Sequence, residues 1–201
     1  MILPERFYTR KNVVQIAKEL LGKKLVTVID GVVTSGIIVE TEAYAGITDK
    51  ASHAYGGRRT ARTETMYAQG GTAYVYLCYG IHHLFNVVTN VEDVPHAVLI
   101  RGVEPIEGVE VMLSRKKKAK RIPNLTAGPG ALSEALGIKT IHTGLSLLSG
   151  SITIEDTGVK VRPKDIKIGT RVGVDYAEED AYAPYRFSIK DNPYVSKGKG
   201  L

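Results

Sequence analysis

Cysteine, tryptophan and long apolar stretches are what this sequence lacks. It contains one cysteine, Cys78, and no tryptophan. A single cysteine excludes an intrachain disulfide and a zinc site built from several cysteines, and it suits a reducing compartment. There is no run of about 18 apolar residues, and no long apolar segment follows the first residues, which argues against a membrane span and a signal peptide. We therefore expect a soluble, intracellular protein without a membrane partner.

The length and charge of the chain limit the number of domains and the class of binding partner. The 201 residues are 43% hydrophobic and 24% charged, a globular composition that can bury a core in one domain spanning residues 1–201. An excess of basic over acidic residues, 27 to 21, gives a net charge of +6. This excess suits a polyanion, because lysine and arginine that neutralise phosphates release counterions. Charge by itself leaves a nucleic-acid partner and a merely basic surface equally open.

The N-terminal part of the chain predicts one helix and one hairpin. Apolar residues recur at helical spacing over residues 13–21, and a glycine follows them. Residues 24–29 and 32–42 are rich in β-branched side chains and are joined by Asp30-Gly31. This dipeptide supplies the positive φ angles of a two-residue turn, so we expect a β-hairpin.

The middle of the chain predicts a long loop and a second hairpin. Residues 45–71 are rich in Gly, Thr, Ala and Arg without clear periodicity, which is typical of a functional loop with room for a short helix. Residues 72–79 and 84–89 are strand-like and flank a turn at Gly80. These two segments therefore predict a second β-hairpin.

The remainder of the chain predicts one longer strand and two helices. Residues 96–103 are strand-like, and Pro105 is placed where a first helical residue could stand, opening a helix into the basic run 115–121. Residues 131–136 predict a short second helix. Short strands are expected within residues 145–174 and 186–189. The sequence therefore predicts a single α+β domain with a mainly antiparallel sheet.

One predicted strand groups residues that could do chemistry. Alternation along residues 38–44 places Glu40, Glu42 and Tyr44 on the same face. A solvated strand face is the simpler interpretation of this spacing. The catalytic interpretation gains support from position, because the strand leads into a loop rich in glycine and arginine that contains His53.

Three tyrosines form a second candidate group beside the predicted turn at Gly80: Tyr74, Tyr76 and Tyr79. Aromatic residues in strands commonly pack across the sheet, which is the simpler interpretation. A tyrosine at an exposed hairpin tip of a basic chain could also wedge between stacked bases. The pattern alone leaves both interpretations open.

Two further patterns have competing interpretations. His82-His83 suggests a metal site, since nearby histidines with a carboxylate can hold zinc or iron. Adjacent strand residues point to opposite faces, however, which makes a shared ion awkward. The basic run that contains Lys116, Lys117 and Lys118 is by default a solvated surface, and nonspecific contact with phosphates is its functional interpretation.

Ordered landmarks run along nearly the whole chain. The first half contains Val39-Glu40-Thr41-Glu42-Ala43-Tyr44, His53, Gly56-Gly57-Arg58, Tyr74-Val75-Tyr76, Tyr79-Gly80 and Asn86. The second half contains Arg101-Gly102-Val103-Glu104-Pro105, Gly128-Pro129, Arg171-Val172-Gly173-Val174, Arg186-Phe187 and Pro193-Tyr194-Val195-Ser196. Their order and spacing resemble the alkyladenine (3-methyladenine) DNA glycosylase family of the animal and bacterial type. So many landmarks are a more specific signal than any single motif.

The resemblance implies a fold and a set of site residues. The implied fold is a curved antiparallel sheet surrounded by short helices, with a protruding β-hairpin. Glu42 corresponds to the general base of the family, and Arg101 to a residue that helps hold the catalytic water. Tyr44, His53 and Tyr76 correspond to contacts with an extruded base, Asn86 to a pocket position that disfavours the amino group of guanine, and Tyr79 to the intercalating wedge.

The activity implied by the resemblance is base excision repair. The enzyme would flip an alkylated, or also a deaminated, purine out of double-stranded DNA and hydrolyse its N-glycosidic bond with water activated by Glu42. Arg58 joins Lys116, Lys117 and Lys118 as candidate contacts to the DNA backbone. The matched pocket positions contain no lysine, so we expect a monofunctional enzyme that does not nick the strand. It should act as a monomer in the cytoplasm or nucleoid, without metal or organic cofactor.

Two rival functions and the choice of lesion stay open at this point. A noncatalytic nucleic-acid-binding module could use the same aromatic and basic residues. A carboxylate such as Glu42 near the phosphates would not help such a module to bind. A metallohydrolase built on His82 and His83 is the third hypothesis. The candidate lesions are 3-methyladenine, 7-methylguanine, hypoxanthine and etheno-adenine.

Overall fold

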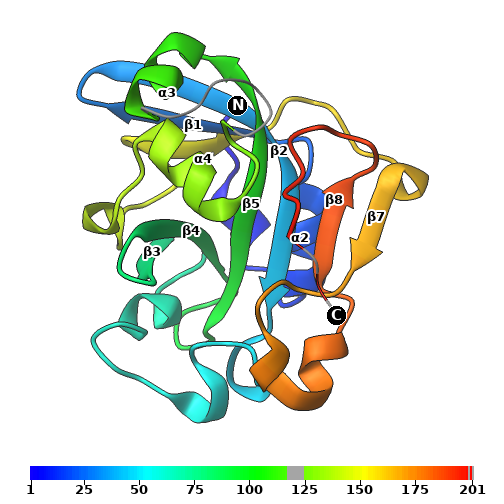
Figure 1. Ribbon diagram of the computed structural model, residues 1–201. Helices are drawn as coiled ribbons and strands as arrows, with labels where there is room; N and C mark the ends of the chain where they lie inside the picture. Colours follow the sequence, from blue (N-terminus) through cyan, green and yellow to red (C-terminus); the bar gives the residue numbers. More distant parts are fainter. Residues whose placement is uncertain (117–124, 199, 201) are drawn as a thin grey trace.

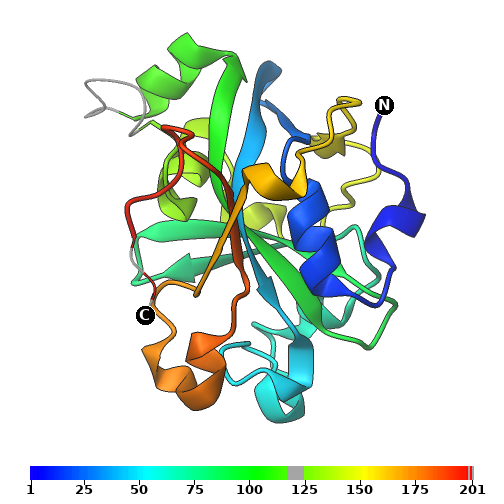
Figure 2. The same ribbon diagram turned by 90° about the vertical axis from the view of Figure 1, so that its right-hand side faces the viewer.

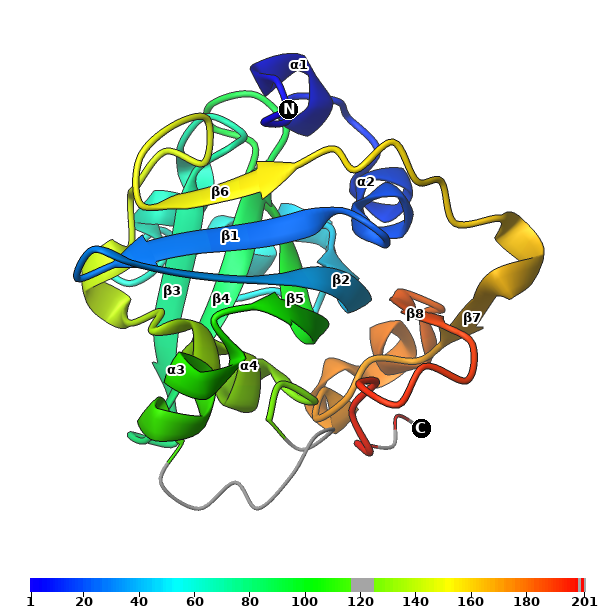
Figure 3. The same cartoon turned by 90° about the horizontal axis from the view of Figure 1, so that it is seen from above.

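One curved antiparallel sheet organises the molecule (Figure 1). The computed structural model describes residues 1–116, 125–198 and 200. The strands are β1 (Lys24–Ile29), β2 (Val32–Tyr44), β3 (Ala73–Cys78), β4 (His82–Thr89), β5 (His96–Glu107), β6 (Ile152–Glu155), β7 (Ile166–Gly169) and β8 (Arg186–Ile189). Their main order is β3-β4-β5-β2-β1-β6, while β8 pairs with β2 and β7 with β8. Seen from above, β1 and β6 run across β3 and β4, which shows the curvature (Figure 3).

Short helices surround this sheet. The α-helices are α1 (Glu5–Tyr8), α2 (Val13–Leu20), α3 (Val109–Arg115) and α4 (Pro129–Leu136). Single 3₁₀ turns are η1 (Gly46–Thr48), η2 (Tyr55–Gly57), η3 (Glu64–Tyr67), η4 (Thr140–His142) and η5 (Pro163–Asp165), and η6 (Asp175–Tyr182) is longer. Helices α2 and α4 lie on opposite sides of the long strands β2 and β5 (Figure 2). The predicted α+β fold is confirmed, and none of the described helices has the length and apolar character needed to cross a membrane.

The N-terminal helix and hairpin form for the reasons expected from the sequence. Helix α2 buries its periodic apolar residues, and the side chain of Asn12 caps it by accepting a hydrogen bond from the Gln15 backbone N–H at 2.9 Å. Strands β1 and β2 pair around Asp30 and Gly31, whose φ angles are 53° and 74°. Both are the positive values that a two-residue hairpin turn requires.

The second hairpin is also confirmed, and its tip is exposed. Strands β3 and β4 pair in register from Ala73↔Val87 to Cys78↔His82, and β3 forms an edge of the sheet. Tyr79 lies in the connecting turn with a φ of 50° and is 91% exposed. The hairpin therefore presents an aromatic ring to solvent at its apex.

The prediction of a helix that begins at Pro105 is wrong. Pro105 lies in β5 opposite Gly36, and α3 begins only at Val109 after Gly108, whose φ is 72°. Two features of the sheet tolerate the proline. The register with β2 is irregular next to Gly36, and β4 has stopped pairing with β5 before this point.

The remaining predicted elements are placed close to where the sequence indicates. Helix α4 begins at Pro129, two residues before the predicted start, with the proline at its first turn and Gly137 closing it at a φ of 74°. Residues 45–71 form a long loop with three 3₁₀ turns. Strands β6, β7 and β8 supply the predicted short strands. The basic run beyond Lys116 falls outside the described residues up to position 124.

Strand β2 passes through the centre of the molecule. Its first half pairs with β1, and its second half pairs with β8 at Glu40–Glu42, while β5 follows it on the other edge. The hydroxyl of Thr41 donates to the Ala17 carbonyl oxygen of α2 at 2.9 Å, so Thr41 faces that helix. Glu40 and Glu42 face the opposite side of the sheet and are fully buried. The fold thus places two carboxylates in its interior.

Gly102 of β5 offers a test of this packing. A Cβ atom there would lie 2.5 Å from the Tyr194 carbonyl oxygen, so the backbone of one of the two segments would have to shift. We expect Gly102→Ala to lower the free energy of unfolding by about 1 to 3 kcal/mol through overpacking, measured by urea denaturation. Gly169→Ala is the control, because a Cβ there meets nothing within 4 Å. Equal stability of the two variants would contradict the prediction.

Candidate active site

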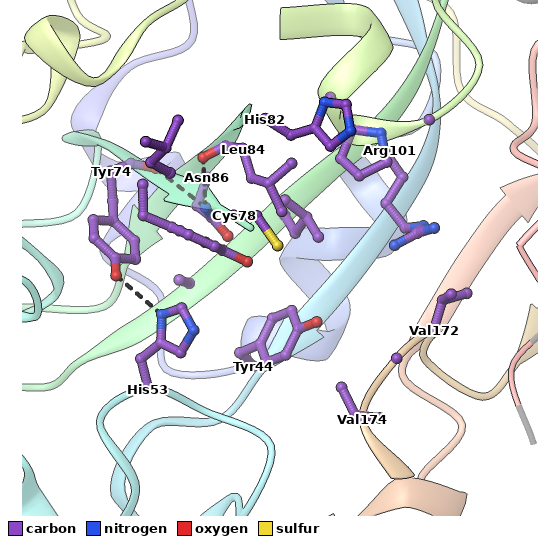
Figure 4. A pocket seen from close by; sticks show the side chains of 18 of the residues that line it. Tyr44, His53, Tyr74, Cys78, His82, Leu84, Asn86, Arg101, Val172 and Val174 are labelled. Carbon is purple, nitrogen blue, oxygen red and sulfur yellow. Dashed lines mark hydrogen bonds between the residues drawn. The ribbon is translucent and has the colours of Figure 1, made fainter. Parts of the chain in front are cut away.

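A cavity of about 620 Å³ opens on the face of the sheet that carries Glu40 and Glu42. Its walls come from β2 to β5, the 45–71 loop, the turn that begins α4, and residues 172–176. Figure 4 shows Arg101 and His82 at one end of the cavity, and Tyr74 and His53 at the other. Six of the site residues implied by the resemblance line it: Tyr44, His53, Tyr76, Tyr79, Asn86 and Arg101.

The carboxylate of Glu42 lies directly behind this wall. It is fully buried and accepts hydrogen bonds from the Tyr44 hydroxyl at 2.9 Å and from the Val172 backbone N–H at 2.8 Å. A guanidinium nitrogen of Arg101 lies 3.3 Å from it. All three partners line the cavity. The interpretation of this strand face as a solvated surface is therefore wrong, because its carboxylates lie in the protein interior.

Glu40, two positions earlier on β2, also sits among arginines. Its Oε1 atom accepts hydrogen bonds from Arg101 Nε at 3.0 Å and from Arg186 Nε at 2.7 Å. Ser196 donates to the same carboxylate through its backbone N–H at 2.7 Å and its hydroxyl at 2.9 Å. Glu40 and Glu42 thus share Arg101, which lies between them.

Three aromatic rings form the other end of the cavity. His53 and Tyr76 meet edge to face with ring centroids 4.6 Å apart, and the rings of Tyr74 and Tyr76 are 5.6 Å apart. Nδ1 of His53 shares a hydrogen bond of 3.0 Å with the Tyr74 hydroxyl, which fixes the orientation of the imidazole. The guanidinium of Arg62 lies over the Tyr76 ring at 5.1 Å. The strand tyrosines therefore line the cavity and also pack across the sheet.

Tyr44 is held from behind by a buried arginine. Arg171 lies over the Tyr44 ring at 4.9 Å and over the Tyr185 ring at 5.3 Å. It also forms an ion pair with Asp49, with Nη2 2.9 Å from Oδ1. Asp49 accepts from the backbone N–H groups of the 45–51 segment as well. This ion pair ties the 45–71 loop to residues 171–174 and sets the position of Tyr44.

Burial keeps the rings around the cavity uncharged. Desolvation raises the pKa of the Tyr44 hydroxyl well above its usual value, and the nearby Glu42 carboxylate raises it further. Desolvation likewise raises the pKa of Tyr76. For His53, desolvation and the cations Arg62 and Arg58 lower the pKa to about 4. Near neutral pH these three side chains therefore present neutral, electron-rich surfaces.

Asn86 projects into the cavity from β4 with its amide orientation fixed. Its Nδ2 donates to the carbonyl oxygens of Tyr74 and Leu84, both at 3.2 Å. Because both amide protons are used on the backbone, the side chain cannot rotate freely. Asn86 is therefore a rigid part of the cavity wall.

The other predicted contacts lie at the cavity mouth or on the surface. Tyr79 lines the mouth from the hairpin tip. Arg58 is exposed in the 45–71 loop, and Lys116 follows the last residue of α3. Lys117 and Lys118 lie outside the described residues. Tyr79 thus lines the same cavity as Arg101, whereas contacts of the basic residues with DNA stay predictions.

The two adjacent histidines point to different elements. The ring of His82 lies against Gly130 at the start of α4, where a Cβ would approach its Nδ1 atom to 2.9 Å. Nδ1 of His83 instead accepts a hydrogen bond from the Thr140 backbone N–H at 3.2 Å. Within the described residues, no group of three or more His, Cys, Asp and Glu side chains could hold a metal ion. A metal site that uses both histidines has no support in this arrangement.

Several site residues have no distinct pattern in the sequence. Arg62 and Tyr176 line the cavity, while Asp49, Arg171 and Arg186 hold its walls from behind. Only Arg171 and Arg186 left a signal, as part of the ordered landmarks. An isolated acidic or basic residue in a loop looks like any surface charge until the fold supplies its partner.

This chain is similar to one group of known proteins along nearly its whole length. The model of the family described as "Methylpurine-DNA glycosylase (MPG)" matches residues 6–193. A protein of Bacillus cereus (strain G9842) described as "Putative 3-methyladenine DNA glycosylase" is 48% identical over 210 residues, covering 98% of this chain and 100% of its own length. Proteins with the same description from Bacillus thuringiensis (strain Al Hakam) and Clostridium perfringens (strain 13 / Type A) are 47% and 48% identical, with the same coverage.

The lowered pKa of His53 predicts a pH-dependent loss of stability. Between about pH 6.5 and pH 4, the unfolded chain binds a proton at this histidine that the folded chain does not. The free energy of unfolding should therefore fall with falling pH, by up to about 1.4 kcal/mol per pH unit from this group. We expect His53→Gln to lose stability less steeply than the wild type in urea titrations at pH 7, 6, 5 and 4.5. The other histidines are common to both proteins, so parallel curves would refute the assignment.

Proposed function

This chain belongs to the methylpurine-DNA glycosylase family, and from that premise we propose that it flips a damaged purine into the cavity and releases it with water activated by Glu42. The chain is a DNA glycosylase, a hydrolase that acts in DNA repair. The observation that carries the finer proposal is the position of the buried Glu42 carboxylate behind the slot of neutral rings.

Extrusion of the nucleotide is the first step. A glycosidic bond inside a duplex is out of reach, and flipping the nucleotide costs a few kcal/mol, least where damage weakens pairing. The exposed Tyr79 ring at the mouth of the cavity is placed to fill the gap that the extruded base leaves in the stack. Its left-handed backbone conformation turns it outward at the hairpin apex.

Stacking in the cavity selects an electron-poor base. Tyr44 on one side, and His53 with Tyr76 on the other, would enclose the purine, each stack being worth about 1 to 3 kcal/mol. Alkylated purines are often cationic, and cations bind well over neutral aromatic faces. Because the pKa of His53 is lowered to about 4, the histidine does not repel such a base near neutral pH.

Glu42 performs the hydrolysis. A carboxylate has about four acceptor positions; hydrogen bonds from Tyr44 and Val172 take two of those on Glu42, and Arg101, with Nη1 3.3 Å from Oε2, faces a third. The remaining one can hold and deprotonate a water that attacks C1′ of the sugar. The same negative charge stabilises the positive charge that develops on the sugar, and burial makes that effect stronger. Arg101 helps to hold the water.

The residues that line the cavity also determine which purines are released and whether the DNA strand is cut. Asn86 cannot turn away, so it disfavours the exocyclic amino group of guanine, which would crowd its side chain. Alkylated purines are the main substrates, and hypoxanthine is the candidate among deaminated ones. No lysine stands among the described residues that line the cavity, which supports a monofunctional enzyme that leaves the strand intact.

The DNA partner is a duplex that contains one damaged purine. Its phosphates would meet the exposed Arg58 and the lysines at positions 116–118, and the net charge of +6 favours that association. One chain supplies every wall of the cavity, so a monomer suffices. A noncatalytic nucleic-acid-binding module, the rival hypothesis from the sequence, would have no use for a buried carboxylate beside its base slot.

Replacing the Glu42 carboxylate by a neutral amide of the same shape distinguishes a glycosylase from a noncatalytic DNA-binding protein. We expect Glu42→Gln to lower the single-turnover rate of free-base release by about 10²- to 10⁴-fold while lesion DNA still binds. The measurement uses duplexes that each carry 3-methyladenine, 7-methylguanine, hypoxanthine or etheno-adenine, with undamaged DNA as the control. Glu110→Gln, an exposed change on α3, is the matched variant. Unchanged release by Glu42→Gln would refute the role, and strand cleavage without alkali would refute monofunctional action.

The wedge at the hairpin tip is tested by removing its ring. We expect Tyr79→Ala to weaken binding of lesion duplexes roughly 5- to 150-fold, which corresponds to the loss of one stack. Tyr79→Phe should bind like the wild type, because the ring and not the hydroxyl fills the gap. Ile141→Ala removes an equally solvent-exposed apolar side chain, 79% exposed, from η4 and serves as the control. Fluorescence of 2-aminopurine beside the lesion reports the flipping.

A further inference from the structure

The carboxylate of Glu40 is buried beside the active site without lining the cavity. It is fully buried and accepts hydrogen bonds from Arg101, Arg186 and twice from Ser196. A buried carboxylate requires such partners, but a structural ion pair would need only one arginine. Here one of the two arginines also reaches Glu42. The role of Glu40 therefore depends on what it does to Arg101.

Arg101 is held at three points. Its Nε donates to Glu40 at 3.0 Å, and its Nη2 donates to the Ser196 hydroxyl at 3.1 Å. Its Nη1 lies 3.3 Å from Glu42 Oε2, the longest of the three distances. An unrestrained arginine pairs with a carboxylate through two parallel hydrogen bonds of about 2.7 to 2.9 Å. Arg101 is thus kept from closing onto Glu42 in that way.

We propose that Glu40, together with Ser196, is a positioning residue that restrains Arg101 so that Glu42 keeps an acceptor position for the attacking water. This inference rests on the proposed function of Glu42. If Glu40 lost its charge, Arg101 would turn toward Glu42, the carboxylate left nearby, and would occupy the acceptor position that the water needs. Base release would slow, while the aromatic slot and the Tyr79 tip would still bind DNA.

Because Ser196 helps to restrain Arg101, the C-terminal segment, residues 192–198, takes part in positioning the catalytic groups. Ser196 belongs to this segment, and Arg186 of β8 fixes it by donating to the carbonyl oxygens of Ser196 at 3.2 Å and Gly198 at 2.8 Å. The segment also rests on Gly102 of β5, next to Arg101. Two carboxylates and two arginines balance their charges in this cluster. The segment therefore completes the site although it touches no part of the base slot.

The test compares the rate of base release with DNA affinity. We expect Glu40→Gln to lower the single-turnover rate about 10- to 100-fold, the range typical of groups that orient a reacting residue, with an unchanged Kd for lesion duplex. Glu40→Asp keeps the charge and should recover most of the rate. Thr27→Val removes an equally buried hydrogen-bonding group from β1 that does not line the cavity, so it should lose stability without losing rate.

A double-mutant cycle shows whether the effect runs through Arg101. In an Arg101→Ala background, Glu40→Gln should change the rate little, because no guanidinium is left to restrain. An equal loss in both backgrounds would overturn the proposal, as would a wild-type rate for Glu40→Gln or an equal loss of rate in Thr27→Val. If Glu40→Gln does not fold, Ser196→Ala decides: a several-fold slower rate that depends on Arg101 supports the proposal, and a wild-type rate overturns it.

The outcomes also separate this proposal from the function on which it rests. Wild-type protein that releases no base from any lesion duplex would refute the proposed function and this inference together. Wild-type release that Glu42→Gln abolishes and Glu40→Gln leaves unchanged would refute the inference alone.

Discussion

Two carboxylates buried side by side on one strand are the constraint that the surrounding structure satisfies. Glu40 and Glu42 cannot stay in the interior without donors, since an unpaired buried charge costs several kcal/mol. Arg101 of β5, Arg186 of β8 and the Ser196 segment supply those donors to Glu40, and residues 171–174 reach Glu42. Segments far apart in the sequence thus converge on β2. The buried carboxylates of β2 require donors, and the C-terminal segments that supply these donors are thereby held against β2.

Neutral rings line the cavity, and a buried carboxylate lies behind one of its walls. Burial keeps the phenols of Tyr44 and Tyr76 protonated and lowers the pKa of His53 to about 4, so no ring carries charge near neutral pH. The rings therefore offer a cation no electrostatic repulsion, and the Glu42 carboxylate lies behind Tyr44. The hydrogen bond between Tyr44 and Glu42 connects the two parts, because one side chain both lines the cavity and donates to the buried carboxylate.

Local sequence signals predicted most elements and part of the site. Apolar periodicity and the Asp30-Gly31 dipeptide were sufficient for α2 and the first hairpin, because both depend on short-range geometry. Pro105 was misleading for the same reason: its fixed φ suits a first helical turn, but an irregular register and a free strand edge also accommodate it. Alternation grouped Glu40, Glu42 and Tyr44, yet it favoured a solvated face, since the spacing says nothing about what covers the strand.

The sequence by itself determined the α+β class, the two hairpins, the position of a tyrosine at a hairpin turn and, through its ordered landmarks, the family. Tertiary structure alone decided that the carboxylates are buried, that Arg101 stands between them, and that Arg171 and Asp49 hold Tyr44 from behind. The physical reason is the sequence separation over which each interaction acts. Turns, caps and periodicity act over a few residues, whereas the burial and pairing of a charge depend on segments up to 156 residues away, as between Glu40 and Ser196.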